Sequence, residues 1–448
     1  MPQSPSTRLI YVLLGLCILL ASCSQFEDDY HAARRARAQS NDTTAPIVIG
    51  VAWNFTDEYN AARVGECANL PVSECPVLPL GKYDMLPLGV HMAVEEINAN
   101  GGVLGGRLLQ IRERDDNESI TQGRLVAQEF AEETDVVAVI GHAYSSISIP
   151  ASPLYEFNGV IMLSPAATSP HLTHRGFTRV FRNLISDDQI GQVLADYAFA
   201  QGYRRVMIIY RDEAYGRDLS NVFETEAARL GVEVVDRRIY SSVDFERIIR
   251  DWAEQEFDAI LIATSSAQDA ALFIKRAGEA GINVPFLGGD GIDSSDIAAI
   301  AGEYAEGTVV ATHYHQDNPR PQLQEFIQRF NARWGDLIPD YQSLWGGVPD
   351  TWAALGYDAV YILANAIEQA GITDPDQLAA YMHEDFVWLD GVTGAYRFDE
   401  KGDVVGKQVV LLRLEDGEFR YFGEFTGIDD ITPPPTPEPE ATTSPEEE

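Results

Sequence analysis

The chain has 448 residues, of which 45% are hydrophobic and 23% are charged. This composition is typical of a globular protein, and the length leaves room for two domains. The formal net charge of -37 makes nucleic acid a poor partner, because a polyanion is repelled by so acidic a surface. Such a charge favours solubility but does not identify a ligand.

The first residues have the pattern of a lipoprotein signal. Arg8 precedes an apolar stretch from Leu9 to Leu20, which is shorter than a bilayer-spanning helix, and small residues follow directly before Cys23. We therefore expect residues 1–22 to be a signal peptide that directs export. Cys23 is expected to carry a lipid that anchors the protein to a membrane, facing the periplasm or the cell exterior. A signal anchor is the alternative.

The segment 23–46 is polar, and we expect it to be a tether between the lipid and the first domain. It contains Arg34, Arg35 and Arg37, which are predicted to lie in a solvated linker. Contact of these arginines with anionic lipid head groups is the alternative.

Two cysteines remain once the signal peptide is removed and Cys23 is lipidated. Cys67 and Cys75 are an even pair in an exported protein, so a disulfide between them is the expected state, and two free thiols are the alternative. Both lie in a long segment, 53–79, that follows the first predicted strand at 47–52. Loops of this length are uncommon unless they are functional, so this one is either a lid over a ligand or a decoration of the rim.

The following segments alternate between helix and strand. Apolar residues at helical spacing predict a helix around 90–97 that ends at Gly101-Gly102, a glycine-type stop. A strand at 108–112 and a helix at 125–133 come next. This alternation indicates an α/β fold with a mostly parallel sheet flanked by helices.

Residues 136–176 are the most informative stretch of the chain. The apolar run 136–140 predicts a buried strand, and a small polar turn follows it directly. The next strand, 160–163, ends in a second turn, SPAATSP, at 164–170. Because ligands of parallel α/β sheets bind at the carboxyl edge, where these turns meet, we expect a binding site there. Hydroxyls and the free N–H groups of helix N-termini suit an anion or a zwitterion; two ordinary loops with capping serines are the alternative.

The pattern restarts after Phe181, which predicts a second domain. Further strands are expected there, with an amphipathic helix over 245–252. We expect the chain to return to the first domain at 308–312 and to cross back with a strand at 395–398. The predicted organisation is lobe 1 over 47–183 and 311–393, lobe 2 over 184–310 and 394–426, and a disordered acidic, Pro-rich tail over 427–448.

The ordered series of these segments resembles the leucine/isoleucine/valine-binding family of periplasmic solute receptors, which serve ABC importers. The resemblance implies a type I periplasmic binding protein: two lobes, each a mostly parallel sheet flanked by helices, joined by hinge crossings that permit closure around a ligand. The matching motifs are Glu96-Ile97-Asn98, Ile140-Gly141-His142, Ser145-Ser146, Ser164-Pro165-Ala166-Ala167-Thr168, Tyr215-Gly216, Gly289-Asp290-Gly291 and Ala305-Glu306-Gly307.

The resemblance also implies a carboxylate site on the first lobe. In the family, the turns after the two central strands hold the ligand's α-carboxylate, which carries over to Ser145, Ala166 and Thr168. Tyr144 stands beside them, where its ring would trim the pocket or pack on the ligand's side chain.

On the second lobe, the resemblance places Asp290 against the ligand's ammonium, although a turn aspartate in a Gly-Gly-Asp-Gly loop is the alternative. Tyr215 matches an aromatic residue that closes over the ligand. The chain departs from the family at Ser266, where an aromatic is usual; Tyr83 is a weaker candidate for a second cleft aromatic, and Trp53 could supply the missing surface. The ligand's side chain therefore stays open between an aliphatic amino acid, a larger or polar one, and an amide-type solute.

No catalytic or metal-binding motif is complete in the sequence. Residues 402–407 lack the spacing of a phosphate loop, and Ser145 with His142 lacks a nucleophile elbow. The histidine pairs at 313/315 and 171/174 lack the full ligand set of a recognised metal site. We therefore expect no enzyme activity, no cofactor and no metal.

The sequence thus predicts a monomeric receptor that binds an amino acid, branched-chain or related, and delivers it to an ABC permease. One alternative is a ligand-sensing receptor of the same fold that acts on a separate signalling partner. Another is an envelope enzyme or structural lipoprotein on this fold, since fold alone does not determine function.

Overall fold

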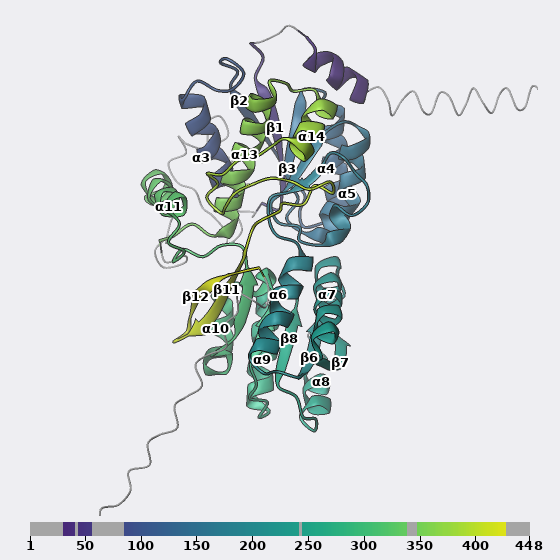
Figure 1. The fold of residues 1–448 in the computed structure, drawn as a ribbon, viewed down its shortest axis with the longest axis vertical. Helices are drawn as coiled ribbons and strands as arrows, with labels where there is room; N and C mark the ends of the chain where they lie inside the picture. Colours follow the sequence, from purple (N-terminus) through teal and green to yellow (C-terminus); the bar gives the residue numbers. More distant parts are fainter. Residues whose placement is uncertain (1–29, 41–43, 56–84, 242–243, 338–346, 427–448) are drawn as a thin grey trace, which may run out of the picture.

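Figure 1 shows two lobes stacked along the long axis of the molecule. In this computed structural model the described residues are 30–40, 44–55, 85–241, 244–337 and 347–426. The predicted signal peptide, the lipidation site Cys23, the pair Cys67 and Cys75, Tyr83 and the acidic tail all lie outside the described residues.

The first lobe contains a five-stranded sheet in the order β2-β1-β3-β4-β5, with parallel pairing throughout. The strands β1, β3 and β4 are buried along their whole length, which explains their continuous apolar runs. The bounds are β1 Ile47–Trp53, β2 Leu109–Asp115, β3 Val136–Gly141, β4 Ile161–Ser164 and β5 Val180–Arg182.

Helices cover both faces of this sheet. One core cluster joins the sheet to α3, α11, α13 and α14, and a second joins it to α4 and α5. The helices α3 and α13 approach closely at Gly89, where a Cβ atom would lie 2.0 Å from the carbonyl oxygen of Ala353. The bounds are α3 Met85–Ala99, α4 Ile120–Glu132, α5 Ser145–Phe157, η2 Pro170–Leu172, α11 Pro321–Trp334, α13 Thr351–Ala370 and α14 Pro375–Glu384.

The second lobe contains a seven-stranded sheet in the order β12-β11-β10-β9-β8-β6-β7, in which β11 pairs antiparallel with both β10 and β12 and all other pairs are parallel. The helices α6 and α7 pack on one face, and α8, α9 and α10 pack on the other. The strands are β6 Arg205–Tyr210, β7 Glu233–Ile239, β8 Ala259–Ala263, β9 Phe286–Gly288, β10 Val309–Thr312, β11 Val409–Glu415 and β12 Glu418–Phe425. The helices are α6 Asp187–Ala200, α7 Ala214–Leu230, α8 Phe245–Trp252, α9 Ala267–Glu279, η3 Asp290–Ile292, α10 Asp296–Ala301 and η4 Gly302–Ala305.

The structure corrects the predicted division of the chain at two places. Strand β10 pairs with β9 and β11 in the second sheet, so the chain returns to the first lobe only after Thr312. Tyr396 and Phe398 pack in the core of the first lobe, so the segment 395–398 does not yet belong to the second. Short buried strands look alike in either sheet, which is why sequence alone misplaced both.

A buried lysine ties two crossings between the lobes together. The ammonium of Lys407, just before β11, donates to the carbonyl of Asn183 at 3.1 Å, just after β5. It also donates to the hydroxyls of Thr393 at 2.6 Å and Tyr396 at 2.8 Å. Both hydroxyls donate in turn to the buried carboxylate of Asp358, at 3.0 and 2.7 Å. Burial lowers the pKa of Lys407 to about 7, and the charge of Asp358 opposes that shift.

Part of the predicted tether is folded. Residues 30–38 form a helix on the first lobe, and the Arg34 side chain on it is buried. Its guanidinium donates to the carbonyls of Phe130, Ala131 and Glu133, which end α4. It also donates to those of Val136 and Asn158. The prediction of a solvated linker is wrong for Arg34, because this cation satisfies helix-end carbonyls that have no partner within the helix.

We expect Arg34→Met to lower the free energy of unfolding by about 2 kcal/mol or more, since five carbonyls lose a charged donor. Denaturant unfolding followed by circular dichroism would measure the change. Arg35→Met is the matched control, because its half-exposed side chain makes only longer ion pairs with Asp374 and Asp376, at 3.7 and 3.4 Å. Equal midpoints for the two variants would contradict the role of Arg34.

Candidate functional site

The two polar turns predicted from the sequence lie together at the carboxyl edge of the first sheet. Strands β3 and β4 are parallel neighbours, and the turns that follow them meet where the hydroxyl of Ser145 accepts a bond from the backbone N–H of Ser169 at 3.3 Å. Ser145 begins α5 and Tyr144 is its N-cap residue, so free N–H groups of the helix end point out at this edge. Thr168 and Ala166 are both buried in the second turn.

A buried arginine that sequence analysis missed holds the second turn in place. Arg182, at the end of β5, donates to the carbonyls of Ala167 at 3.1 Å and Thr168 at 2.6 Å. Its Nε also donates to the carboxylate of Asp403 at 2.5 Å. Since its charge is already paired within the protein, Arg182 shapes the turn. This role can be recognised only from the burial of Arg182 at a strand end, which the sequence does not show.

On the second lobe, Tyr215 packs against the loop that carries Asp290. Its hydroxyl accepts a bond from the N–H of Gly291 at 3.1 Å, and a Cβ atom at Gly289 would lie 2.5 Å from that oxygen, so a glycine is required there. Burial raises the pKa of Tyr215 well above its usual value, and the nearby carboxylates of Asp290 and Asp187 add to the shift. The phenol therefore stays protonated and can donate a hydrogen bond.

Asp187 is a second acidic residue of this region that sequence analysis missed. It begins α6, its side chain is fully buried, and its backbone N–H donates to the carbonyl of Thr168 at 2.9 Å. Burial raises the pKa of its carboxyl well above the usual value, and Asp290 raises it further, while the Thr168 hydroxyl lowers it. In the sequence it looks like an ordinary acidic residue in a first helical turn.

His313 and Asp293 complete the polar surroundings of Asp290. The Nε2 atom of His313 lies 3.5 Å from Oδ2 of Asp290, and its side chain is only 2% exposed. The hydroxyl of Thr312 donates to Asp293 at 2.9 Å. Burial raises the pKa of Asp293 to about 7, with Thr312 lowering it and Asp290 raising it. Within the described ranges, no group of three or more His, Cys, Asp or Glu side chains could hold a metal ion.

The lobes touch beside these residues. Asp218 on α7, in the second lobe, accepts bonds from two groups of the first lobe: the hydroxyl of Ser169 and, at 3.0 Å, Nδ1 of His171. This bridge lies directly next to the turn that carries Thr168. The polar turn at 164–170 and the acidic Asp218 therefore meet from opposite lobes at a point where the lobes are in contact.

The remaining predicted residues lie as follows. Trp53 is buried at the end of β1, with its ring centroid 6.1 Å from that of Trp352. The hydroxyl of Ser266 caps α9 by accepting a bond from the N–H of Asp269 at 3.2 Å. Their roles toward a ligand stay predictions, as does that of Tyr83.

His142 does not act on Ser145 as a base. Its two ring nitrogens lie 2.8 Å from a carboxylate oxygen of Asp116 and 3.0 Å from the hydroxyl of Tyr155, and all three side chains are buried. The imidazole is therefore engaged away from Ser145.

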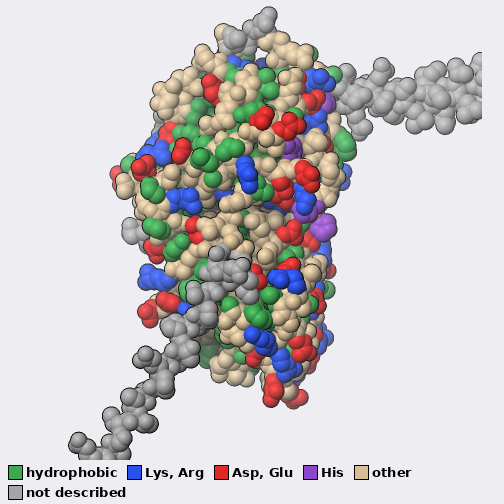
Figure 2. All heavy atoms as spheres, viewed as in Figure 1, with side chains coloured by type: hydrophobic (Ala, Val, Ile, Leu, Met, Phe, Trp, Pro, Cys, Tyr) green, Lys and Arg blue, Asp and Glu red, His purple; other side chains and the backbone are tan. Residues whose placement is uncertain are grey.

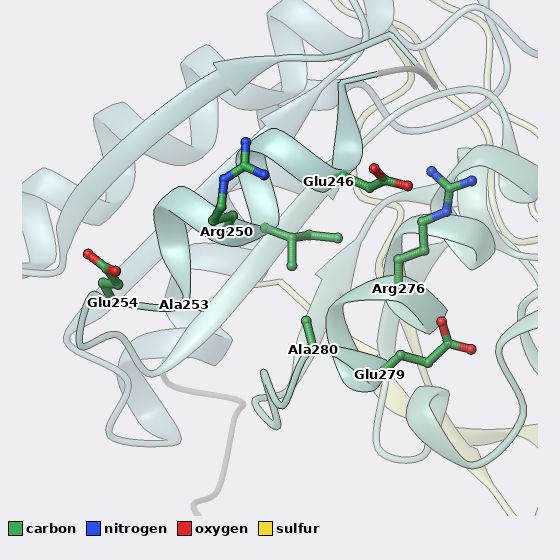
Figure 3. Close-up of a pocket in the computed structure, with 8 residues that line it drawn as sticks. Glu246, Arg250, Ala253, Glu254, Arg276, Glu279 and Ala280 are labelled. Carbon is green, nitrogen blue, oxygen red and sulfur yellow. The ribbon is translucent and has the colours of Figure 1, made fainter.

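A separate groove of about 580 Å³ lies on the outer side of the second lobe, between α8 and α9 (Figure 3). Charged side chains of both signs line it, and it contains none of the predicted ligand residues. Its lining is Glu246, Ile249, Arg250, Ala253, Glu254, Arg276, Glu279 and Ala280. Acidic and basic side chains are also interspersed over both lobes on the face shown in Figure 2. No helix of the described ranges is long and apolar enough to cross a membrane.

Two α/β lobes, joined by several crossings and facing each other with polar strand ends, define a two-lobed solute-binding protein. The chain belongs to the periplasmic binding protein family, whose model matches residues 86–418. The predicted family and fold are therefore confirmed. The prediction that the chain is not an enzyme is also confirmed, because its relatives are solute-binding proteins.

Several similar proteins are named for amino acids. The chain is 30% identical over 344 residues to Leu/Ile/Val-binding protein homolog 1 of Brucella suis, covering 73% of this chain and 86% of that protein. A substrate-binding protein of Desulfitobacterium hafniense, solved in complex with Leu, is 36% identical with a TM-score of 0.68, covering 84% of this chain and 99% of that one. A leucine-binding protein of Thermotoga maritima is 27% identical with a TM-score of 0.70, covering 86% of this chain and all, 100%, of that one.

Proposed function

We propose that the protein is the substrate-binding lipoprotein of an ABC importer and that it binds a branched-chain or related amino acid between its lobes. The observation that supports this most is the juxtaposition of a hydroxyl-rich turn and a buried acid, joined by the bond from the Asp187 N–H to the Thr168 carbonyl at 2.9 Å. An α-amino acid carries its carboxylate and its ammonium on one carbon, so it needs complementary groups this close together.

The electrostatics of the cleft suit this zwitterion. Neutral donors at Ser145 and Thr168 would meet the carboxylate, and Asp290 would meet the ammonium. Charge-assisted hydrogen bonds are strong where water is excluded, and the groups named here are buried. The solved relative from Desulfitobacterium hafniense holds leucine, which makes an aliphatic side chain the first choice for this chain too.

In this proposal a monomer is held to the membrane by a lipid on Cys23 and delivers its ligand to the permease. Ligand that contacts both lobes favours the closed form, because it binds that form better than the open one. Small-angle scattering with and without leucine would test closure, since compaction on binding is required.

We expect leucine to raise the melting temperature of the purified protein, because a ligand that binds only the folded state stabilises it, by about 2.7 kcal/mol at a hundred times its dissociation constant. Thr168→Ala should abolish most of this rise. Thr225→Ala is the control, since the Thr225 hydroxyl bonds only its own helix, to the carbonyl of Asn221. The absence of a shift with every common amino acid would refute the proposed function.

A further inference from the structure

Three buried polar side chains around the predicted ammonium site lack hydrogen-bond partners within the described part of the chain. They are both carboxylate oxygens of Asp187, Oδ1 of Asp290, and both ring nitrogens of His313. The Thr168 hydroxyl acts on Asp187 and the Tyr215 hydroxyl on Asp290, but neither reaches the atoms named here with hydrogen-bond geometry. Leaving such groups unsatisfied costs a folded protein free energy, of about 1–3 kcal/mol for a neutral group and more for a charged one.

The three side chains converge from separate segments. Asp187 starts α6, Asp290 starts η3 after β9, and His313 directly follows β10. His313 lies 3.5 Å from Asp290, and after burial the charge of Asp290 contributes most to the raised pKa of Asp187. The segments also touch: a Cβ atom at Gly289 would lie 3.4 Å from Ile190, one turn along α6 from Asp187.

An ammonium group matches this arrangement. It has three N–H donors, and the cluster offers acceptors on three sides: a carboxylate of Asp187, Oδ1 of Asp290 and an imidazole nitrogen of His313. Natural proteins keep destabilising arrangements of this kind mainly where function requires them. The bond from the Asp187 backbone to Thr168 sets the ammonium next to the carboxylate turn.

We propose that Asp187 and His313 bind the ligand's ammonium together with Asp290, and that the ammonium displaces a proton from this cluster as it enters. The inference rests on the proposed function and assigns two further binding residues to it. The proton leaves a carboxyl group and passes to solvent. The positive charge of the ligand's ammonium then takes the place of that proton beside the carboxylate.

The charges around Asp187 favour this exchange. Its acidic neighbours outnumber its basic ones, and the guanidinium of Arg182 is already bonded to Asp403. Burial among more acidic than basic neighbours raises the pKa of Asp187 in the empty protein, which favours the protonated form of this carboxyl. A bound ammonium lowers that pKa, so affinity should rise with pH until the raised value is passed. The titratable or charged groups that face the cluster are Asp290, Asp218, Arg182, Tyr215, Asp293 and, through Asp218, His171.

The test is isothermal titration calorimetry of the wild-type protein with L-leucine, in phosphate and in Tris at the same near-neutral pH. We expect the binding enthalpies to differ, because release of up to about one proton per leucine adds the buffer's heat of ionisation. Asp187→Asn should bind leucine at least about tenfold more weakly and release fewer protons. His313→Leu should also weaken binding, and His313→Gln should restore part of it by keeping an acceptor.

Stability separates a binding role from a structural one. Without ligand, Asp187→Asn should melt at or above the wild-type temperature at pH 8, because the substitution removes a buried carboxyl whose oxygens have no hydrogen-bond partner among the described residues. A structural role predicts a lower melting temperature. Asp196→Asn is the control: it lies on the same helix, is equally buried, and faces Arg229 at 3.7 Å, so leucine affinity should not change.

The possible results are distinct. If wild-type protein binds neither leucine nor any other amino acid, the proposed function fails and the inference fails with it. If leucine binds with equal enthalpy in both buffers and with unchanged affinity in Asp187→Asn, the inference alone is overturned. The buffer comparison needs no variant, so it decides the proton exchange even if a substituted protein does not fold.

Discussion

Asp290→Ala is expected to weaken leucine binding by about 2 kcal/mol or more, roughly thirtyfold or more, which is the range seen when one partner of a buried charge pair is truncated. Oδ1 of Asp290 has no hydrogen-bond partner among the described residues, and Asp290 lies in a loop that the Tyr215 hydroxyl contacts at Gly291. Once it is gone, the ligand's ammonium is desolvated beside a weaker set of acceptors. Calorimetric titration at pH 8 would measure the loss.

A control for Asp290 lies in the same lobe. Asp212→Ala removes an exposed carboxylate that pairs with Arg217 at 2.7 Å, and leucine affinity should stay within a factor of about two. If Asp290→Ala also leaves affinity unchanged, Asp290 is not a ligand residue and the ammonium must bind elsewhere.

Lys407→Met is expected to lower the free energy of unfolding by about 1–3 kcal/mol, as for leaving buried hydrogen-bond acceptors unsatisfied. Methionine has a similar volume, so the loss of stability comes from lost hydrogen bonds and not from a cavity. The carbonyl of Asn183 loses its donor, and the two hydroxyls that bond Asp358 lose the amine that bonds them. Because Asn183 and Lys407 lie on different crossings, the substitution should also loosen the connection between the lobes.

Guanidinium unfolding at neutral pH would measure this change, with a shift in the midpoint expected. Lys401→Met, on an exposed turn in the same connecting region, is the control and should leave the midpoint within experimental error. A midpoint shift no larger than that of the control would show that the network at Lys407 contributes little to stability.

The sheet strands and the position of the two polar turns could be predicted because their signals are local. Buried parallel strands appear as short apolar runs, and Ser145 and Thr168 stand directly after two of them. The motifs around Asp290 and Tyr215 could also be found in the sequence, because both are short and occur in the order that the family resemblance implies.

The rest depends on contacts between distant parts of the chain. Strand β10 is a four-residue apolar segment, and only its pairing with β9 and β11 assigns it to the second sheet. Asp187 looks like an acid that favours a helix N-terminus, and His313 looks like a strand end, until the fold places both beside Asp290. Arg34 looked solvated because its carbonyl partners lie about a hundred residues further along the chain.

If the protein is anchored through its N-terminus, as proposed, the contacts of Arg34 attach the first lobe to that anchor. The guanidinium of Arg34 donates to the carbonyl of Val136 at the start of β3, whereas the two polar turns follow the carboxyl ends of β3 and β4. In Figure 1 the 30–38 helix lies at the end of lobe 1 away from lobe 2. A protein anchored by its N-terminus would therefore be attached through lobe 1. Lobe 2 would be the moving lobe, and the space between the lobes would lie away from the point of attachment. A force on the anchored N-terminus would load the hydrogen bonds of Arg34 before it reached the connections between the lobes. Ligand binding would therefore be little affected by movements of the membrane.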